Sequence, residues 1–133
     1  MAVEQALLWF GVLTLVMLSI EVNTTYVTKG FGFGFSSNRP AAEKTGLPLR
    51  ISRAYVNQVE SAAYIVPVLA AAAFQGLTGF GVETAALLVV AGRFGFALFY
   101  FTGIHFARVP FFAVTVLSVI YLIYALLTQG AAV

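Results

Sequence analysis

The sequence predicts an all-α integral membrane protein, a four-transmembrane-helix up-down bundle whose single domain covers residues 1–133. Three observations support this fold class. Of the 133 residues, 61% are hydrophobic and 9% are charged, and the mean hydropathy is +0.96. A soluble domain of this size could not bury so much apolar surface, so the solvent must be lipid. The apolar residues also form long uncharged runs, and most of the basic residues lie between those runs.

The first predicted span covers residues 4–27 and is built on the uncharged run from Gln5 to Ile20. About 20 apolar residues are needed to cross a bilayer as a helix. We do not expect this run to be a removable signal peptide, because it lacks a basic start and a small-residue cleavage site. Glu4 and Glu21 lie at its two ends, so the run is interpreted as the first helix of the bundle.

Three further spans are predicted at residues 53–77, 83–104 and 109–129. The connections between them are short, so consecutive spans should be antiparallel neighbours. Small residues such as Gly92 and Gly95 should allow the third span to pack closely against another helix.

The longest polar segment is the predicted loop 28–52, which holds most of the Lys and Arg residues of the chain. Arg108 lies in the third connection, whereas the N-terminus, the second connection and the C-terminus contain no Lys or Arg. The positive-inside rule therefore predicts that loops 1 and 3 are cytoplasmic and that both termini lie outside. The net charge of +2 follows this topology, so we do not expect nucleic acid as a partner.

The chain contains no cysteine, which excludes disulfides, cysteine metal ligands and a cysteine nucleophile. We expect no metal site. Polar side chains instead crowd the start of the second span, in the segment RISRAYVNQVE. On a helix, Arg50, Arg53, Asn57 and Glu60 fall within about 80° of arc, and Tyr64 extends the same stripe. A continuous stripe is what a binding site needs, whereas scattered charges would require only snorkelling.

The third span carries a matching polar face, because Arg93 and Tyr100 are seven residues apart. Arg93 and Glu60 should lie at similar depths in antiparallel helices, so we expect an ion pair between them. A charged residue at the middle of a spanning helix costs about 2.5–3.5 kcal/mol, which indicates a partner or a function. With Arg108 at the rim, these groups would line a cationic, water-filled recess open to the cytoplasm. Such a recess would suit a small polyanionic ligand with amide groups.

Purely structural roles would explain parts of this pattern. A Glu60–Arg93 pair could do no more than fix the register of two helices. Arg50 and Arg53 could anchor a helix end to lipid headgroups, and Tyr100 could be an interfacial or core residue. The full set favours a ligand site, but the residues alone leave these alternatives open.

Two segments resemble the signatures of the MAPEG family, the membrane-associated proteins in eicosanoid and glutathione metabolism. RAYVNQVE resembles the R-A-x-x-N-x-x-E signature, and SNRP before it is similar to an Asn-Arg turn common in bacterial members. GRFGFALFYFTGIHFARVPFF resembles the second signature, with Arg93, Tyr100 and Arg108 at the family's spacing. The resemblance runs from about Asn38 to Phe112 and implies a bacterial-type member in the bacterial plasma (inner) membrane.

The resemblance implies a homotrimer of four-helix subunits that binds glutathione, as co-substrate, between neighbouring subunits near the cytoplasmic side. The glutathione-binding residues implied by motif position are Arg53, Asn57, Glu60 and Arg93, with Arg50 and Arg39 as further contacts. Arg108 would stabilise the glutathione thiolate, with help from Tyr100. The implied activity is that of a transferase or peroxidase acting on hydrophobic electrophiles or lipid hydroperoxides, within a shell of membrane lipids.

The sequence departs from the family pattern at two positions. Val56 stands where several animal members have a second Arg, and Phe96 stands where some have His. Both departures weaken the expected grip on glutathione, so a non-catalytic membrane subunit used for assembly or lipid binding is a second hypothesis. A small proton-coupled transporter that uses Glu21 is a third and less favoured one.

Overall fold

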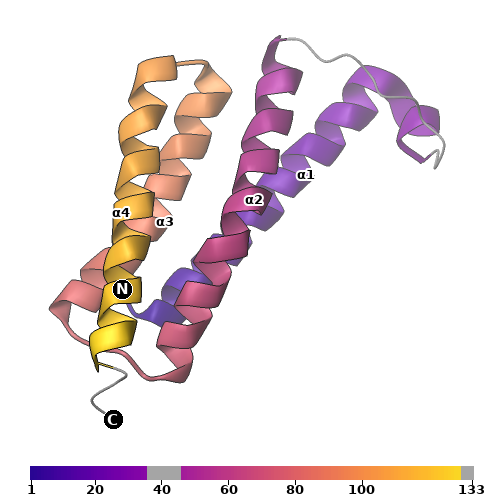
Figure 1. Ribbon diagram of the computed structural model, residues 1–133. Coiled ribbons are helices and arrows are strands. Elements are labelled where there is room, and N and C mark those ends of the chain that lie inside the picture. Colours follow the sequence, from indigo (N-terminus) through magenta and orange to yellow (C-terminus); the bar gives the residue numbers. More distant parts are fainter. Residues whose placement is uncertain (36–45, 130–133) are drawn as a thin grey trace.

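The computed structural model describes residues 1–35 and 46–129, with side chains described for residues 1–27, 46–104 and 106–129. These residues form helices that run up and down in turn (Figure 1). The helices are α1 Val3–Phe35, α2 Gly46–Phe74, α3 Phe80–Thr102 and α4 His105–Gln129. Each contains a stretch that is long and apolar enough to cross a membrane. The predicted four-helix membrane fold is therefore confirmed.

The predicted loop over residues 28–52 is wrong at both ends. α1 continues to Phe35 and α2 begins at Gly46. A helix satisfies its own backbone hydrogen bonds, so it can continue past its apolar run without further support. Pro48 lies in the first turn of α2, where its missing N–H removes no hydrogen bond within the helix. Arg39, which was predicted to contact the ligand, lies outside the described residues.

Two tight turns make consecutive helices antiparallel neighbours, as predicted. Gly76 follows α2 with a φ of 67°, and the Leu77 N–H donates to the Ala72 carbonyl at 3.0 Å. This pattern ends a helix by placing a glycine in the left-handed conformation. Gly103 ends α3 in the same way, with a φ of 80°. The chain therefore reverses within a few residues at each end of α3.

Glycines bring α3 and α4 into close contact. A Cβ atom at Gly92 would collide with the Thr115 hydroxyl and would lie 3.0 Å from the Phe111 carbonyl oxygen. A Cβ atom at Gly95 would collide with the Phe111 ring. Small residues allow membrane helices to approach until their backbones are nearly in contact. The close packing expected of these two glycines is thus found on the face that α3 presents to α4.

Buried apolar residues form a large cluster at one end of the bundle and a small one toward the other end. The large cluster joins all four helices near the N-terminus and the α2–α3 turn. The small cluster consists of Met17, Ala54 and Ala97. Figure 1 shows α1 and α2 diverging from the α3–α4 pair toward the end where α2 begins. The bundle is therefore held tightly at one end and loosely at the other.

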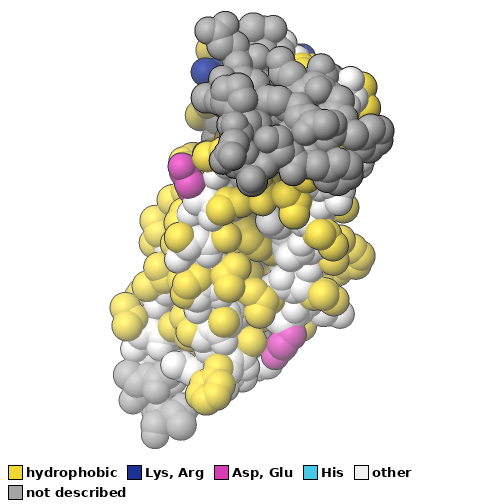
Figure 2. Space-filling view, turned by 90° about the vertical axis from the view of Figure 1, so that its right-hand side faces the viewer, with side chains coloured by type: hydrophobic (Ala, Val, Ile, Leu, Met, Phe, Trp, Pro, Cys, Tyr) yellow, Lys and Arg dark blue, Asp and Glu magenta, His cyan; other side chains and the backbone are white. Residues whose placement is uncertain are grey.

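The surface of the subunit is suited to contact with lipid. Figure 2 shows a face on which hydrophobic side chains predominate and charged groups are few. Three of the most exposed apolar side chains are phenylalanines at helix ends, namely Phe74 (94% exposed), Phe80 (88%) and Phe106 (90%). Such rings are well placed to meet the boundary between lipid tails and headgroups. Their positions agree with helices that end near the two faces of a membrane.

Candidate functional site

The candidate site is organised around Arg93, which lies on α3 and is 0% exposed. Its Nε donates a hydrogen bond to Gln58 Oε1 at 2.9 Å, and its Nη2 donates to Asn57 Oδ1 at 2.8 Å. Both acceptors lie on α2. The predicted meeting of the polar stripe of α2 with the polar face of α3 therefore takes place at Asn57.

Gln58 is a member of the site that the sequence analysis missed. It is 0% exposed, and its Nε2 donates to the Thr14 hydroxyl of α1 at 3.0 Å. A signal was available, because Ala54, Gln58, Ser61 and Ile65 follow the spacing of a core-facing helix edge. An amide on such an edge must find partners among its neighbours. We call Thr14, Asn57, Gln58 and Arg93 the Arg93 centre.

The predicted Glu60–Arg93 ion pair is wrong. Both residues are described, yet no ion pair joins them, and Glu60 is exposed. Asn57 and Glu60 differ by about 60° around a helix axis. Because α2 turns its core edge toward α1 and α3, Asn57 reaches Arg93 while Glu60 points outward. Arg53 is also exposed, so the predicted stripe is divided between an inner and an outer face.

Two aromatic rings connect Arg93 with a second cation, Arg108, beyond the end of α3. The Arg93 guanidinium carbon lies 4.5 Å from the centroid of the Phe96 ring. The Phe96 and Tyr100 rings meet edge to face at 5.5 Å, and the Arg108 guanidinium carbon lies 4.3 Å from the centroid of the Tyr100 ring. Cations are attracted to the faces of such rings. The structure thus brings Tyr100 and Arg108 together, and Phe96 links them to Arg93.

Arg50 has a structural contact at the open end of the bundle. Its Nε donates to the Phe101 carbonyl oxygen at 3.1 Å, and its side chain lies against Gly103. A cation at this place satisfies a carbonyl of the last turn of α3 and complements the helix dipole. Arg50 therefore connects the start of α2 to the end of α3.

Glu21 lies apart from the Arg93 centre, in the half of α1 that approaches the start of α2. It is half-buried, and the Ser52 hydroxyl donates to its Oε1 at 3.4 Å. Among the described residues, no cluster of three or more His, Asp or Glu side chains could hold a metal ion. The chemistry of the centre is thus that of cations, amides and aromatic rings.

The positive charge of Arg93 has no carboxylate beside it within the described part of the chain. Its Nη1 atom is buried and has no hydrogen-bond acceptor there. Neutral amide oxygens and one aromatic ring are its partners. A buried charge without an opposite charge is costly in a low-dielectric interior. An anion close to this centre would lower that cost.

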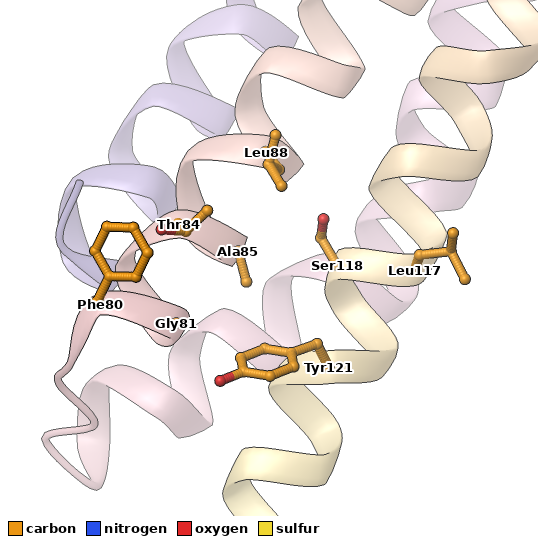
Figure 3. A pocket seen from close by; sticks show the side chains of 8 residues that line it. All are labelled: Phe80, Gly81, Thr84, Ala85, Leu88, Leu117, Ser118 and Tyr121. Carbon is orange, nitrogen blue, oxygen red and sulfur yellow. The ribbon is translucent and has the colours of Figure 1, made fainter.

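A separate apolar groove lies between α3 and α4 (Figure 3). Its volume is about 320 Å³. It is lined by Phe80, Gly81, Thr84, Ala85, Leu88, Leu117, Ser118 and Tyr121. The lining residues of α3 lie in the half of that helix that precedes Arg93, and the others lie in the half of α4 that leads to the C-terminus. The groove is therefore not part of the Arg93 centre.

These features define a class of protein: an integral membrane protein of four helices with a buried polar centre between α1, α2 and α3. The sequence model of the MAPEG family matches residues 6–128, which is nearly the whole chain, and the protein belongs to the MAPEG family. The predicted family is thereby confirmed. Searches of the curated proteins and of the solved structures gave no match.

Proposed function

We propose that the protein is a glutathione-dependent membrane transferase or peroxidase that acts on hydrophobic electrophiles or lipid hydroperoxides. The observation that carries this proposal is the contact of Asn57 and Gln58 with Arg93, which joins the two family signatures at one buried cation. The protein belongs to the MAPEG family, which includes glutathione transferases and peroxidases. This membership suggests glutathione as the anionic ligand of Arg93.

The residues present fit glutathione, which carries two carboxylates and two amide groups. Arg93 has a buried nitrogen that lacks an acceptor among the described residues, and Asn57 offers its amide nitrogen as a donor. Arg53 and Glu60 are exposed on α2, where they can meet a carboxylate and an ammonium group. Arg50 and Arg39 are proposed as further contacts with glutathione.

Bound glutathione would supply the sulfur nucleophile that attacks the electrophile or reduces the hydroperoxide. We propose that Arg108 and Tyr100 stabilise that sulfur as a thiolate. A free thiol has a pKa near 8.5, so little thiolate exists at neutral pH. A lowering of about two pKa units needs about 2.7 kcal/mol, which one guanidinium in a partly desolvated place can provide. Arg108 is half-buried and held against the Tyr100 ring, and this position suits the role.

We further propose that three copies of the chain assemble around their α2 helices. Exposed residues of α2 recur at alternating steps of three and four, the spacing that packs one helix against another. We call this surface the outer face of α2. It consists of Arg53, Val56, Glu60, Ala63, Pro67 and Ala70. Assembly on this face would place Arg53 and Glu60 between subunits, where a ligand could bridge two copies.

The proposed orientation follows the basic residues. Arg50, Arg53 and Arg108 lie at the end of the bundle where α2 begins, and the N-terminus lies at the other end (Figure 1). The positive-inside rule places the basic end in the cytoplasm and both termini outside. In a bacterial plasma membrane, the Arg93 centre would then be reached from the side that contains glutathione.

Binding and turnover of glutathione by the purified full chain test this function. Glutathione should raise the melting temperature in detergent, and S-methylglutathione should do so without supporting turnover. Conjugation of a chlorinated nitrobenzene, or reduction of a lipid hydroperoxide, should depend on glutathione. Absence of any melting shift at millimolar glutathione would contradict the proposal.

A second candidate function is a non-catalytic membrane subunit. The observation that favours it is the Phe96 ring, which covers the Arg93 guanidinium at 4.5 Å and occupies a place where some relatives have a polar group. Val56 likewise leaves an apolar, 49% exposed side chain on the outer face of α2. Glutathione binding without turnover, or stable assembly without glutathione binding, would favour this candidate.

A further inference from the structure

The hydrogen bonds of the Arg93 centre have a fixed direction. The Thr14 hydroxyl donates to the Phe10 carbonyl at 2.8 Å, so its hydrogen is used within α1. The hydroxyl oxygen can then accept, and Gln58 Nε2 donates to it at 3.0 Å. The Gln58 amide oxygen must therefore face α3, where it accepts from Arg93 Nε at 2.9 Å. Thr14 thus determines which end of the Gln58 amide meets the guanidinium.

This arrangement holds Arg93 without neutralising it. Arg93 and Gln58 are both 0% exposed, so water does not screen the charge. In residues 1–35 and 46–129, the hydrogen-bond acceptors of Arg93 are the amide oxygens of Gln58 and Asn57. A carboxylate at either place would form an ion pair and cancel the charge. Glutamate has an oxygen in place of the NH2 group of glutamine and nearly the same shape, so the neutral amide is what leaves the Arg93 charge unpaired.

Asn57 lies at the half-buried edge of the centre and, like Gln58, contacts Arg93 through a neutral amide. Its Oδ1 accepts from Arg93 Nη2, so its Nδ2 is left as a donor. No described residue accepts a hydrogen bond from that nitrogen. The centre therefore offers a positive charge and an amide donor side by side. Together they match a carboxylate on a peptide-like ligand.

We propose that Gln58 is a positioning residue that determines specificity for an anionic ligand. Its amide ties the guanidinium to α1 and α2 through Thr14 and leaves the positive charge to pair with a carboxylate of the ligand. The proposal deepens the function proposed above and rests on it for the identity of the ligand as glutathione. The preference for a carboxylate over its neutral ester is the property that Gln58 confers.

The test compares Gln58→Glu with Gln75→Glu, a matched control that makes the same change at an exposed position after α2. Binding of glutathione, its diethyl ester and glutarate is measured by calorimetry on the full chain in detergent. The wild type should bind glutathione at least about tenfold more tightly than the ester. Gln58→Glu should weaken glutathione binding at least about tenfold and abolish the preference for the acid, whereas Gln75→Glu should behave as the wild type.

Gln58→Met separates positioning from mere packing, because it removes the hydrogen bonds and adds no charge. It should lower the melting temperature and weaken the preference for glutathione over the ester, because the guanidinium is no longer held in place, and a fully retained preference would overturn the positioning role. Gln58→Glu should melt no lower than the wild type, since its carboxylate can pair with Arg93. Should Gln58→Glu fail to fold, Asn57→Asp adds a carboxylate at the other acceptor and should cause the same loss.

The outcomes separate this inference from the proposed function. Unchanged glutathione binding by Gln58→Glu would overturn the role of Gln58 and leave the glutathione function standing. Binding of glutarate but not glutathione by the wild type, lost in Gln58→Glu, would support the role of Gln58 and overturn the glutathione function. A wild type that binds neither acid, or binds acid and ester equally, would overturn the inference.

Discussion

Asn57 on α2 accepts a hydrogen bond from Arg93 on α3 at 2.8 Å, and this contact joins the two signature segments of the chain. The segments are far apart in the sequence, yet Asn57 and Gln58 of the first both contact Arg93 of the second. The Asn57–Arg93 contact is partly buried, and the neighbouring Gln58 continues the hydrogen bonds into α1. Three helices are thereby tied together at the level where the apolar core is thin.

Arg93→Lys should weaken both ligand binding and stability. A lysine ammonium is a point donor and cannot reach Gln58 and Asn57 with the fixed fork of a guanidinium. At least one buried acceptor would lose its partner, at a cost of about 1–3 kcal/mol. Unfolding in a denaturing detergent, followed by circular dichroism, should show the loss. Arg53→Lys is the control for stability, because Arg53 is exposed and the change should leave no buried acceptor without a partner. Equal stability of the two variants would contradict the role assigned to the buried guanidinium of Arg93.

Gly92→Ala and Gly95→Ala should each destabilise the protein by about 1–3 kcal/mol, the range for overpacking a well-packed contact. The added methyl groups would collide with Thr115 and Phe111 of α4. Gly11→Ala is the matched control, because its Cβ would meet no atom within 4 Å. The same substitution in α1 should be neutral or slightly stabilising. Similar unfolding curves for all three variants would argue against the close α3–α4 contact.

Arg108→Ala should reduce glutathione conjugation at least about tenfold, which corresponds to about 1.4 kcal/mol of lost transition-state stabilisation. Tyr100→Phe keeps the ring beneath the Arg108 guanidinium and removes only the hydroxyl. Its loss of activity should therefore be smaller than that of Arg108→Ala. The measurement is the initial rate with a chlorinated nitrobenzene at saturating glutathione. A variant Arg108→Ala with the rate of the wild type would remove Arg108 from the chemistry.

A cysteine at Ala63 should form a disulfide between copies of the chain in membranes. The natural chain has no cysteine, so Ala63→Cys carries a single thiol on the outer face of α2. Oxidation should convert it to a dimer on a non-reducing gel. Ile120→Cys, on a 55% exposed position of α4, is the control and should remain monomeric. Equal cross-linking at the two positions would count against assembly through α2.

The sequence predicted the fold well because its signal is strong. A long apolar run crosses a bilayer as a helix, so the four predicted spans agree with the structure to within a few residues at most ends. The ends of the loop were predicted less well. Residues 46–52 contain a glycine, a proline and polar side chains that are typical of a loop, but they form the first turns of α2. Polarity alone does not end a helix outside the lipid.

The site was predicted only in part, for a geometric reason. Helical spacing showed that Arg93 and Tyr100 share a face, but it could not show how α2 is rotated about its own axis. That rotation decides whether Asn57 or Glu60 faces Arg93, and the core edge of α2 fixes it in favour of Asn57. Gln58 escaped notice because a single amide within an apolar edge carries little weight until its partners are known.

The glycine contact between α3 and α4 has a mechanical consequence. Because α3 and α4 are joined by a tight turn and their backbones nearly touch, the pair should move as one rigid unit. Any opening of the bundle at the buried Arg93 must then come from a movement of α1 and α2 relative to the α3–α4 pair. The large apolar cluster near the chain termini would serve as the pivot of this movement. Under the function proposed above, a lipid substrate would reach Arg93 by such a hinge movement between two helical pairs, with α3 and α4 keeping their mutual register throughout.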